Sequence, residues 1–446
     1  MTEMIPVDEV LERLLRDQRD RALPAATHRD IRVPELPNMA TTFVGMRRVG
    51  KSVLMAQEMA RLVADGVPRT SILAINLEDD RLGAPDVAML SGALEWLFRT
   101  GPRRYEQTAH VFLDEVQAVP GWERFVRRVL DTENVRVRLT GSSAKLLSTE
   151  VATEFRGRSI AVEVPPFNFR EYLRHRDLEP DDPADVSAAE RSRLEAGFAA
   201  FLREGGFPAI QGAHEVDRVR TLQDYVELVV YRDVVERWNA TNRVALEWLV
   251  GHMLSNFARE FSLNRIFKDL KQKGLAVSKD TLYAYLGHLV DARLLHTVGI
   301  RSTSYRTRQV NPRKIYAVDQ GLAAATAHPS AEDTGHLLEN AVYLDLRRRY
   351  CRLHDEAVTY YSDAYGNADF VVDGSLDEPM VVQACASLSD AGTRDREIAG
   401  AMAAMRGTGV NRSTIVTLTE SGEYETPAGA VSVVPGWRWL LREDEG

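Results

Sequence analysis

A glycine-rich loop and an acidic strand end hold the residues of this sequence that could do chemistry. Residues 45–52 read GMRRVGKS, and residues 110–115 read HVFLDE. Gly45 and Gly50 allow backbone N–H groups of the loop to turn inward around phosphate oxygens, and the N-terminus of a following helix adds positive potential there. The pattern G-x-x-x-x-G-K-[ST] therefore predicts a binding site for the phosphates of a nucleotide.

Four side chains of the two motifs have separate expected roles. Lys51 is expected to neutralise the β- and γ-phosphates, and Ser52 to bind magnesium. Asp114 would hold the same Mg²⁺, and Glu115 would act as general base toward the attacking water. ATP and Mg²⁺ are thus the expected cofactors. The loop residues expected to contact the nucleotide are Gly45, Arg47, Arg48, Val49, Gly50, Lys51, Ser52 and Val53.

Hydroxyl side chains end a third predicted strand, at residues 135–143. Thr140, Ser142 and Ser143 stand at its end. One of these hydroxyls, from Thr140 or Ser142, could face the γ-phosphate and sense it. Residues 140–143 could instead be a polar cap on the next helix. The sequence leaves both interpretations open.

Two arginines precede the last predicted strand of this region. Arg158 could reach a γ-phosphate across a subunit boundary as an arginine finger, which would make the active form an oligomer. A surface salt bridge is the alternative, and it is the preferred interpretation for Arg156.

The motifs need strands and helices to hold them, and the pattern predicts an alternation of the two. An apolar strand precedes residue 45, and an amphipathic helix follows from Lys51 to about Ala64. Further strands are expected at residues 71–78, 110–115, 135–143 and 159–165, with helices near 87–98 and 121–131. Such an alternation predicts an α/β fold with a mostly parallel sheet and helices on both faces.

Composition restricts the class of protein. The length of 446 residues suggests several domains, and 44% hydrophobic with 27% charged residues is typical of a globular protein. A net charge of −9 argues against a uniformly basic surface that coats nucleic acid.

Location is also restricted by the sequence. No run approaches a membrane span, and the N-terminus lacks the features of a signal peptide. Two cysteines, Cys351 and Cys385, are too few for a disulfide framework or a four-ligand zinc site. We expect a cytoplasmic protein with no membrane partner.

Further segments accompany the two motifs in a collinear order. They read INLED, VFLDEVQAVPGWERFVRRVLD, LTGSSAKLLSTEVATEFRGRS, VPPFNFREYL, EGGFPAI, YRDVVERW, YAVDQGLAAA and GHLLENAVYLDLRRR. Over nearly its whole length the chain resembles the bacterial and archaeal AAA+ ATPases usually named only "ATP-binding protein". The resemblance implies an AAA+ module, a winged-helix segment and a C-terminal domain similar to PD-(D/E)xK nucleases.

The expected domains follow from pattern and resemblance together. They are an N-terminal helix (1–30), an AAA+ P-loop core (31–176), a linker and helical lid region (177–245), a winged helix (246–325) and a PD-(D/E)xK-like domain (326–446).

The winged-helix segment is the candidate for contact with double-stranded DNA. Ser262 and Ser278 are expected to cap its second and third helices. Lys279, Thr281 and Tyr283 lie near the start of the third, where a recognition helix would sit. The predicted wing carries Arg301, Arg306, Arg308, Arg313 and Lys314. A lid or a protein contact is the alternative role.

The C-terminal domain matches the nuclease pattern only in part. Glu339 and Asp369 occupy the first two acidic positions, which would hold Mg²⁺. The third position reads Gln383-Ala384-Cys385, so an amide replaces a carboxylate and a thiol replaces the lysine. We therefore expect a retained fold without nuclease activity. Cys385 is expected to be an ordinary buried cysteine and not a nucleophile.

These observations favour an ATPase that couples nucleotide state to rearrangement or oligomerisation of the winged-helix and nuclease-like domains. The alternatives are a nucleotide-switched DNA-binding protein of regulation or defence, an ATP-dependent nuclease, and a scaffold that binds ATP without hydrolysing it.

Overall fold

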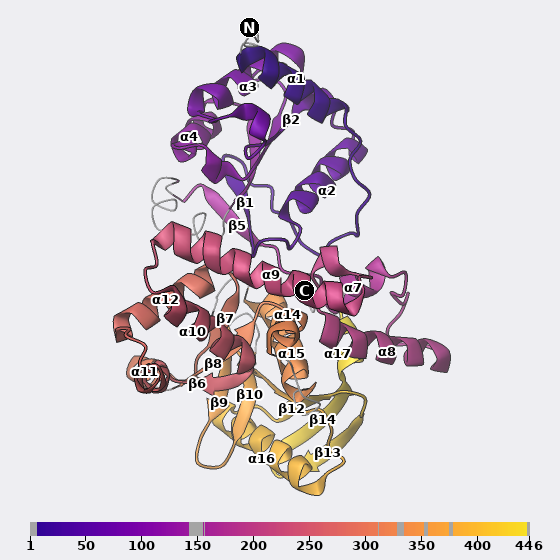
Figure 1. The fold of residues 1–446 in the computed structure, drawn as a ribbon. Helices are drawn as coiled ribbons and strands as arrows, with labels where there is room; N and C mark the ends of the chain where they lie inside the picture. Colours follow the sequence, from indigo (N-terminus) through magenta and orange to yellow (C-terminus); the bar gives the residue numbers. More distant parts are fainter. Residues whose placement is uncertain are drawn as a thin grey trace. The chain divides into compact units, whose positions relative to one another are not determined.

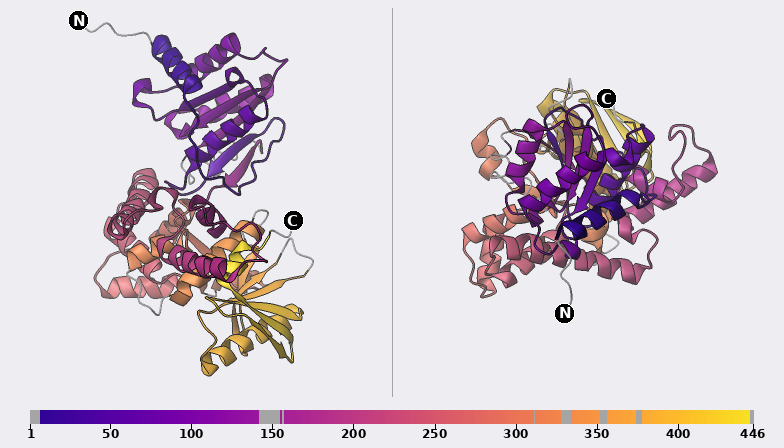
Figure 2. Two further views of the ribbon diagram at one scale, coloured as in Figure 1. Left: turned by 90° about the vertical axis from the view of Figure 1, so that its right-hand side faces the viewer. Right: turned by 90° about the horizontal axis from the view of Figure 1, so that it is seen from above.

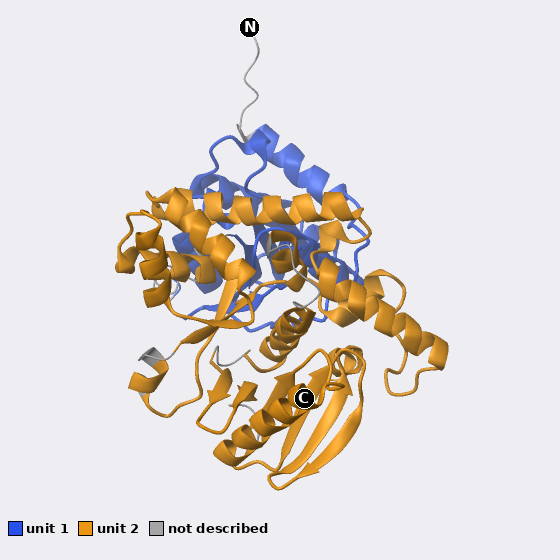
Figure 3. Ribbon diagram, turned by 60° about the horizontal axis from the view of Figure 1, so that its bottom comes forward, with its two compact units in different colours: residues 1–165 blue, residues 166–446 orange. Residues whose placement is uncertain are grey.

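The computed structural model divides the chain into two compact units, residues 1–165 and 166–446 (Figure 3). It describes residues 7–141, 155, 157–310, 312–327, 334–351, 356–373 and 378–443. Ser142, Ser143 and Arg156, three residues considered for the nucleotide site, lie outside the described residues.

A five-stranded parallel sheet forms the centre of the first unit (Figure 1). Its strands are β1 (Ala40–Val44), β2 (Ile72–Asn76), β3 (Ala109–Asp114), β4 (Val135–Thr140) and β5 (Ser159–Glu163). Their order is β2-β3-β4-β1-β5, and every neighbouring pair is parallel. The α/β fold with a parallel sheet is thus confirmed. Since the strands are parallel, the carboxyl ends of β1, β3 and β4 lie at the same edge of the sheet.

Helices cover both faces of this sheet. They are α1 (Val7–Asp20), α2 (Lys51–Ala64), α3 (Val87–Thr100) and α4 (Trp122–Thr132), with short 3₁₀ turns at Arg69–Ser71, Asp80–Leu82 and Val116–Ala118. Residues of α1, α3 and α4 share one hydrophobic cluster with alternate strand residues. Helix α2 lies on the opposite face, where the Arg138 guanidinium of β4 approaches Glu58 of α2 at 3.9 Å (Figure 1).

The second unit begins with a helical region. Its elements are α7 (Phe169–His175), α8 (Ala188–Glu204), a 3₁₀ turn (Pro208–Ile210), α9 (Glu215–Leu228) and a π-helix, η5 (Val229–Glu236). The sequence predicts plain helix for residues 222–238. The structure changes to the wider π-helix at Val229, over only eight residues, which is too short for an apolar pattern to distinguish from an α-helix.

Further helices and a small antiparallel sheet follow. The elements are α10 (Arg243–Ser255), β6 (Arg259–Phe261), α11 (Leu263–Gln272), α12 (Lys279–Asp291), β7 (Leu295–Val298), α13 (Tyr305–Val310) and β8 (Arg313–Ala317). The strand order is β6-β8-β7. The Ser278 hydroxyl accepts a hydrogen bond from the Thr281 N–H, as predicted, whereas the side chain of Ser262 makes no capping bond.

A six-stranded mixed sheet dominates the last part of the chain, and Figure 2 shows its strands side by side in yellow and orange. Its strands are β9 (Val358–Ser362), β10 (Asn367–Val372), β11 (Met380–Ala384), β12 (Arg412–Thr417), β13 (Gly422–Thr426) and β14 (Gly429–Pro435). The accompanying helices are α14 (Gln320–Ala327), α15 (Thr334–Tyr350), α16 (Ala391–Thr408) and α17 (Gly436–Leu441).

A buried carboxylate joins the helical region to α14. The Asp319 side chain accepts hydrogen bonds from the N–H groups of Gly206, at 2.7 Å, and Leu322, at 2.9 Å. A Cβ on Gly205 would lie 2.0 Å from Asp319 Oδ1, so only glycine fits. Two segments far apart in sequence, EGGFPAI and YAVDQGLAAA, therefore meet here. Burial raises the pKa of Asp319 to about 6, although these N–H groups oppose the shift.

Candidate nucleotide site

The GMRRVGKS loop connects β1 to α2 at the carboxyl edge of the parallel sheet. Gly50 adopts a left-handed conformation (φ 98°) as the N-cap of α2. A Cβ on Gly45 would lie 2.2 Å from the carbonyl oxygen of Val164, so this position needs glycine as well. Crevices beyond the carboxyl ends of parallel strands are the usual ligand sites of open α/β sheets.

An arginine that sequence reasoning missed supports the loop from outside. The Arg29 guanidinium is buried and donates to the carbonyl oxygens of Val49, at 3.2 Å, and Pro165, at 2.6 Å. It thereby links the phosphate loop to the end of the first unit. No local motif marks Arg29, because its partners lie 20 and 136 residues away in the chain.

Lys51 lies over the loop that it follows. Its ammonium is buried and donates to the carbonyl oxygens of Gly45, at 3.0 Å, and Met46, at 3.1 Å. The charge is therefore held within the turn of the loop, where phosphate oxygens are expected. Of the other predicted loop contacts, Val49 is fully buried, whereas Val53 is 43% exposed. Arg48 has a positive φ of 69°.

Asp114 lies at the centre of the polar groups of this edge. Its carboxylate accepts hydrogen bonds from the hydroxyls of Thr140 and Ser52. Burial raises the pKa of Asp114, and the two hydroxyls together with Lys51 oppose that shift. A carboxylate and a hydroxyl are the hard oxygen ligands that Mg²⁺ takes, so Asp114 and Ser52 fit that ion.

Thr140 also contacts the neighbouring acidic residue. Its hydroxyl accepts a hydrogen bond of 3.0 Å from the Glu115 N–H while donating to Asp114. The side chain is fully buried at the end of β4, between β3 and β1. The hydroxyl thus links both acidic residues.

Glu115 has an unusual backbone and a specific partner. Its φ of 55° places it in the left-handed region, where the backbone of a residue other than glycine is strained. The Gln117 amide donates to Glu115 Oε2 at 2.6 Å. The sequence does not suggest this contact between two residues that are two positions apart. The positive φ of Glu115 turns the chain so that the Gln117 amide reaches the Glu115 carboxylate.

Arg158 lies apart from these groups within its own chain. It forms an ion pair with Asp131 of α4, and both side chains are about half exposed. This is the geometry of the surface salt bridge, and it does not by itself test a role across a subunit boundary.

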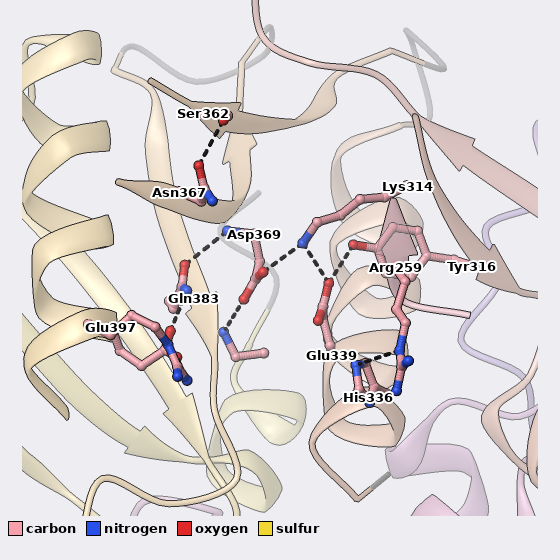
Figure 4. Close-up of polar contacts among 12 residues, drawn as sticks. Arg259, Lys314, Tyr316, His336, Glu339, Ser362, Asn367, Asp369, Gln383 and Glu397 are labelled. Carbon is pink, nitrogen blue, oxygen red and sulfur yellow. Dashed lines mark hydrogen bonds and ion pairs between the residues drawn. The ribbon is translucent and has the colours of Figure 1, made fainter. Parts of the chain in front are cut away.

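In the C-terminal domain, the predicted acidic pair, Glu339 and Asp369, lies together with a lysine that the sequence placed on the wing of the winged helix (Figure 4). Lys314, expected on the wing, contacts Glu339 and Asp369 at 2.9 and 2.7 Å. A second wing residue, Arg301, pairs with Asp373 at 2.8 Å.

The third nuclease position contributes neither a carboxylate nor an ammonium. Gln383 donates through its amide nitrogen to Glu397 at 2.5 Å. Cys385 is buried, and burial raises the pKa of its thiol to about 11, so it remains protonated as expected of an ordinary cysteine.

Two family models match parts of the chain. Residues 37–173 match the AAA domain, and residues 196–333 match a domain of unknown function. The first match covers the loop, Asp114, Glu115 and Thr140. The match begins just before β1 and extends past the end of β5.

Similar proteins are known from archaea and bacteria. An uncharacterized protein of Methanocaldococcus jannaschii is 28% identical over 99% of this chain and 97% of its own length. An uncharacterized protein of Haemophilus influenzae is 26% identical over 68% of this chain and 73% of its own length.

Solved structures give only a distant likeness. The Orc1 protein of Aeropyrum pernix, solved in complex with DNA, is 16% identical over 73% of this chain and 93% of its own, with a TM-score of 0.28. Among the residues described, no helix has the length and apolar character that crossing a membrane requires.

Proposed function

We propose that this chain is an AAA+ ATPase that binds Mg-ATP and hydrolyses it to ADP and phosphate. The observation that carries the proposal is the meeting of Ser52, Asp114 and Thr140 beside Lys51 at one sheet edge. Hydroxyl, carboxylate and ammonium groups in this arrangement suit a triphosphate and its metal ion.

Each residue has a place in the proposed reaction. Lys51 and the loop N–H groups bind the phosphates, while Ser52 and Asp114 would hold Mg²⁺, which supplies charge neutralisation when bound. Glu115 accepts a proton from the attacking water. Thr140 orients both acidic residues through its two hydrogen bonds.

Glu115→Gln tests hydrolysis separately from binding. Phosphate release should fall by about 10²–10⁴-fold because the general base is lost. Binding of a fluorescent ATP analogue should be retained, since the proposed role of Glu115 is toward the attacking water and not toward the phosphates. Lys51→Ala is the matched variant and should lose binding as well. Unchanged phosphate release in Glu115→Gln would contradict the proposal, and wild-type binding without release would favour a scaffold.

The energy of ATP is proposed to rearrange or assemble the second unit. The helix and strand order of residues 243–317, with its β6-β8-β7 sheet, supports a winged helix. The mixed sheet with Glu339 and Asp369 at neighbouring elements supports a nuclease-like fold, and the amide at Gln383 argues against nuclease activity.

A nucleotide-switched DNA-binding protein is the second candidate, and an exposed basic cluster on α11 and α12 favours it. Its members are Arg265, Lys268 and Lys271 of α11, Lys273 just after the end of α11, and Lys279 at the start of α12. With Asp269 and Asp280 the segment 263–283 has a net charge of +3 (five minus two), against −9 for the whole chain. Such a cluster would contact DNA phosphates and give a salt-dependent affinity.

The salt dependence of DNA affinity tests this candidate. Replacing Lys268 and Lys271 with glutamine should reduce the slope of log K against log salt by about 0.9 for each lost phosphate contact. Arg191→Gln, which removes an exposed cation of α8, should leave the slope unchanged. Affinity should also differ between ATP and ADP. A slope in the Lys268 and Lys271 variant that equals the slope of Arg191→Gln would exclude α11 as the contact.

A further inference from the structure

An ammonium group lies between the two carboxylates of the C-terminal domain (Figure 4). Lys314 extends from β8, and its Nζ donates to Glu339 Oε1 of α15 at 2.9 Å and to Asp369 Oδ1 of β10 at 2.7 Å. The three side chains are only 10–14% exposed. Three elements distant in sequence therefore converge on one buried cation.

The carboxylate oxygens have further donors from the protein. Tyr316, on the same strand as Lys314, donates its hydroxyl hydrogen to Glu339 Oε1 at 2.8 Å. The N–H of Ala384 donates to Asp369 Oδ2 at 3.0 Å. Three carboxylate oxygens are thus already bound to N–H or O–H groups, and a metal ion would have to displace the donors.

The neighbouring residues do not complete a metal site. Gln383 is oriented by two contacts, accepting from the Asp369 N–H at 2.9 Å and donating to Glu397 at 2.5 Å. The part of the chain that the structure describes holds no group of three His, Cys, Asp or Glu side chains placed to bind a metal. These residues therefore do not fit the Mg²⁺ that a nuclease-like domain implies.

The Lys314 contacts also connect two sheets. Next to them, the backbone N–H of Arg301 donates to the Tyr360 carbonyl at 2.7 Å, and the Tyr360 N–H donates back to the Gly299 carbonyl at 3.0 Å. The Tyr360 hydroxyl donates to the Pro312 carbonyl at 2.7 Å. The segment between β7 and β8 is thus attached to β9, the edge strand of the six-stranded sheet.

We propose that the Lys314 ammonium replaces a divalent cation between Glu339 and Asp369. The acidic pair is then a fixed joint between the small sheet and the six-stranded sheet, and it is closed to metal. Buried carboxylates need a cation nearby, and a lysine from β8 supplies it without dissociating. The proposal holds whether or not the first unit hydrolyses ATP.

Removing the ammonium should open a metal site. Mn²⁺ is titrated by calorimetry into the full chain without nucleotide. Lys314→Met should bind an additional Mn²⁺ ion relative to wild type, because two uncompensated carboxylates attract it. Lys314→Arg, which keeps a cation, should gain none, and Lys314→Met with Asp369→Asn should lose the gain. A folded Lys314→Met chain without additional Mn²⁺ would overturn the proposal.

A second measurement needs no change at Lys314. Mn²⁺ should raise the melting temperature of wild type and of Asp369→Asn by the same amount, because the pair binds no metal in either chain. A rise that is larger in wild type by about 2 °C or more would show that Glu339 and Asp369 bind the metal ion, and it would contradict the proposal.

Discussion

The most specific contacts at the scale of single residues surround the Thr140 hydroxyl. Thr140→Val keeps the shape of the side chain but leaves the Glu115 N–H and Asp114 without their shared partner. A lost buried hydrogen-bond partner costs about 1–3 kcal/mol, so ATP hydrolysis should fall by about 5–160-fold.

Thr140→Ser is the matched control, because it retains the hydroxyl. It should keep most of the activity in the same phosphate-release assay. Equal activity of the valine and serine variants would show that the hydroxyl has no part in hydrolysis, and Thr140 would then be only a strand end.

A second residue-scale prediction concerns Asp319. Its pKa is raised by burial from 3.8 to about 6. The folded chain therefore binds this proton more tightly than the unfolded chain, and the stability contributed by the group is full below about pH 4 and lost as the pH rises through about 6. From about pH 5 to about pH 7.5, wild type should lose roughly 1 kcal/mol of unfolding free energy relative to Asp319→Asn.

Denaturant unfolding of both chains at the two pH values measures this difference. The asparagine side chain of the variant would also turn an NH₂ group toward the N–H of Gly206 or Leu322, a loss that is present at every pH. A difference between the two chains that stays constant with pH would show that Asp319 has an ordinary pKa in the folded state.

At the scale of elements, Lys314 joins β8, α15 and β10. Lys314→Met should lower the free energy of unfolding of the second unit by about 3–5 kcal/mol, because two buried carboxylates lose their cation. Arg308→Met is the control, since it removes a cation from the same segment. Arg308 pairs with an 85% exposed Glu356, and its loss should cost about 0–1 kcal/mol.

Thermal unfolding of the two methionine variants tests the prediction. Comparable small losses would mean that the buried pair contributes no more than a surface pair. The result would also bear on the wing, because Lys314 and Arg301 were expected to face DNA. They are instead engaged with Glu339, Asp369 and Asp373.

At the scale of the whole molecule, the prediction concerns oligomerisation, and variants of Arg158 test it. If Arg158 acts on ATP of a neighbouring subunit, ATPase activity per chain should rise with protein concentration. Arg158→Ala should abolish that rise, with a loss of about 10³-fold or more. Asp131→Asn frees Arg158 from its partner within the chain and should retain the rise.

Phosphate release measured from nanomolar to micromolar protein, beside mass photometry, decides the matter. Activity that stays proportional to concentration and is unchanged in Arg158→Ala would leave Arg158 as a partner of Asp131 alone. The chain would then hydrolyse ATP as a monomer, and nucleotide state would act only on arrangement within the chain.

Local pattern alone predicted much of this protein. The alternation of apolar strands and amphipathic helices is a short-range property, so the parallel sheet of the first unit followed from it. The loop at residues 45–52 and the acidic pair at 114–115 were recognisable because their spacing is contiguous.

Contacts between distant residues were decided only by the tertiary structure. Arg29 reaches the loop from outside its motif, and Asp319 meets Gly206 across 113 residues. Lys314 reads as one more cation of a basic wing, yet it lies buried between two carboxylates. The physical reason is that a charge on a strand carries no local record of its partner, because the packing of other elements determines which groups exclude water around it.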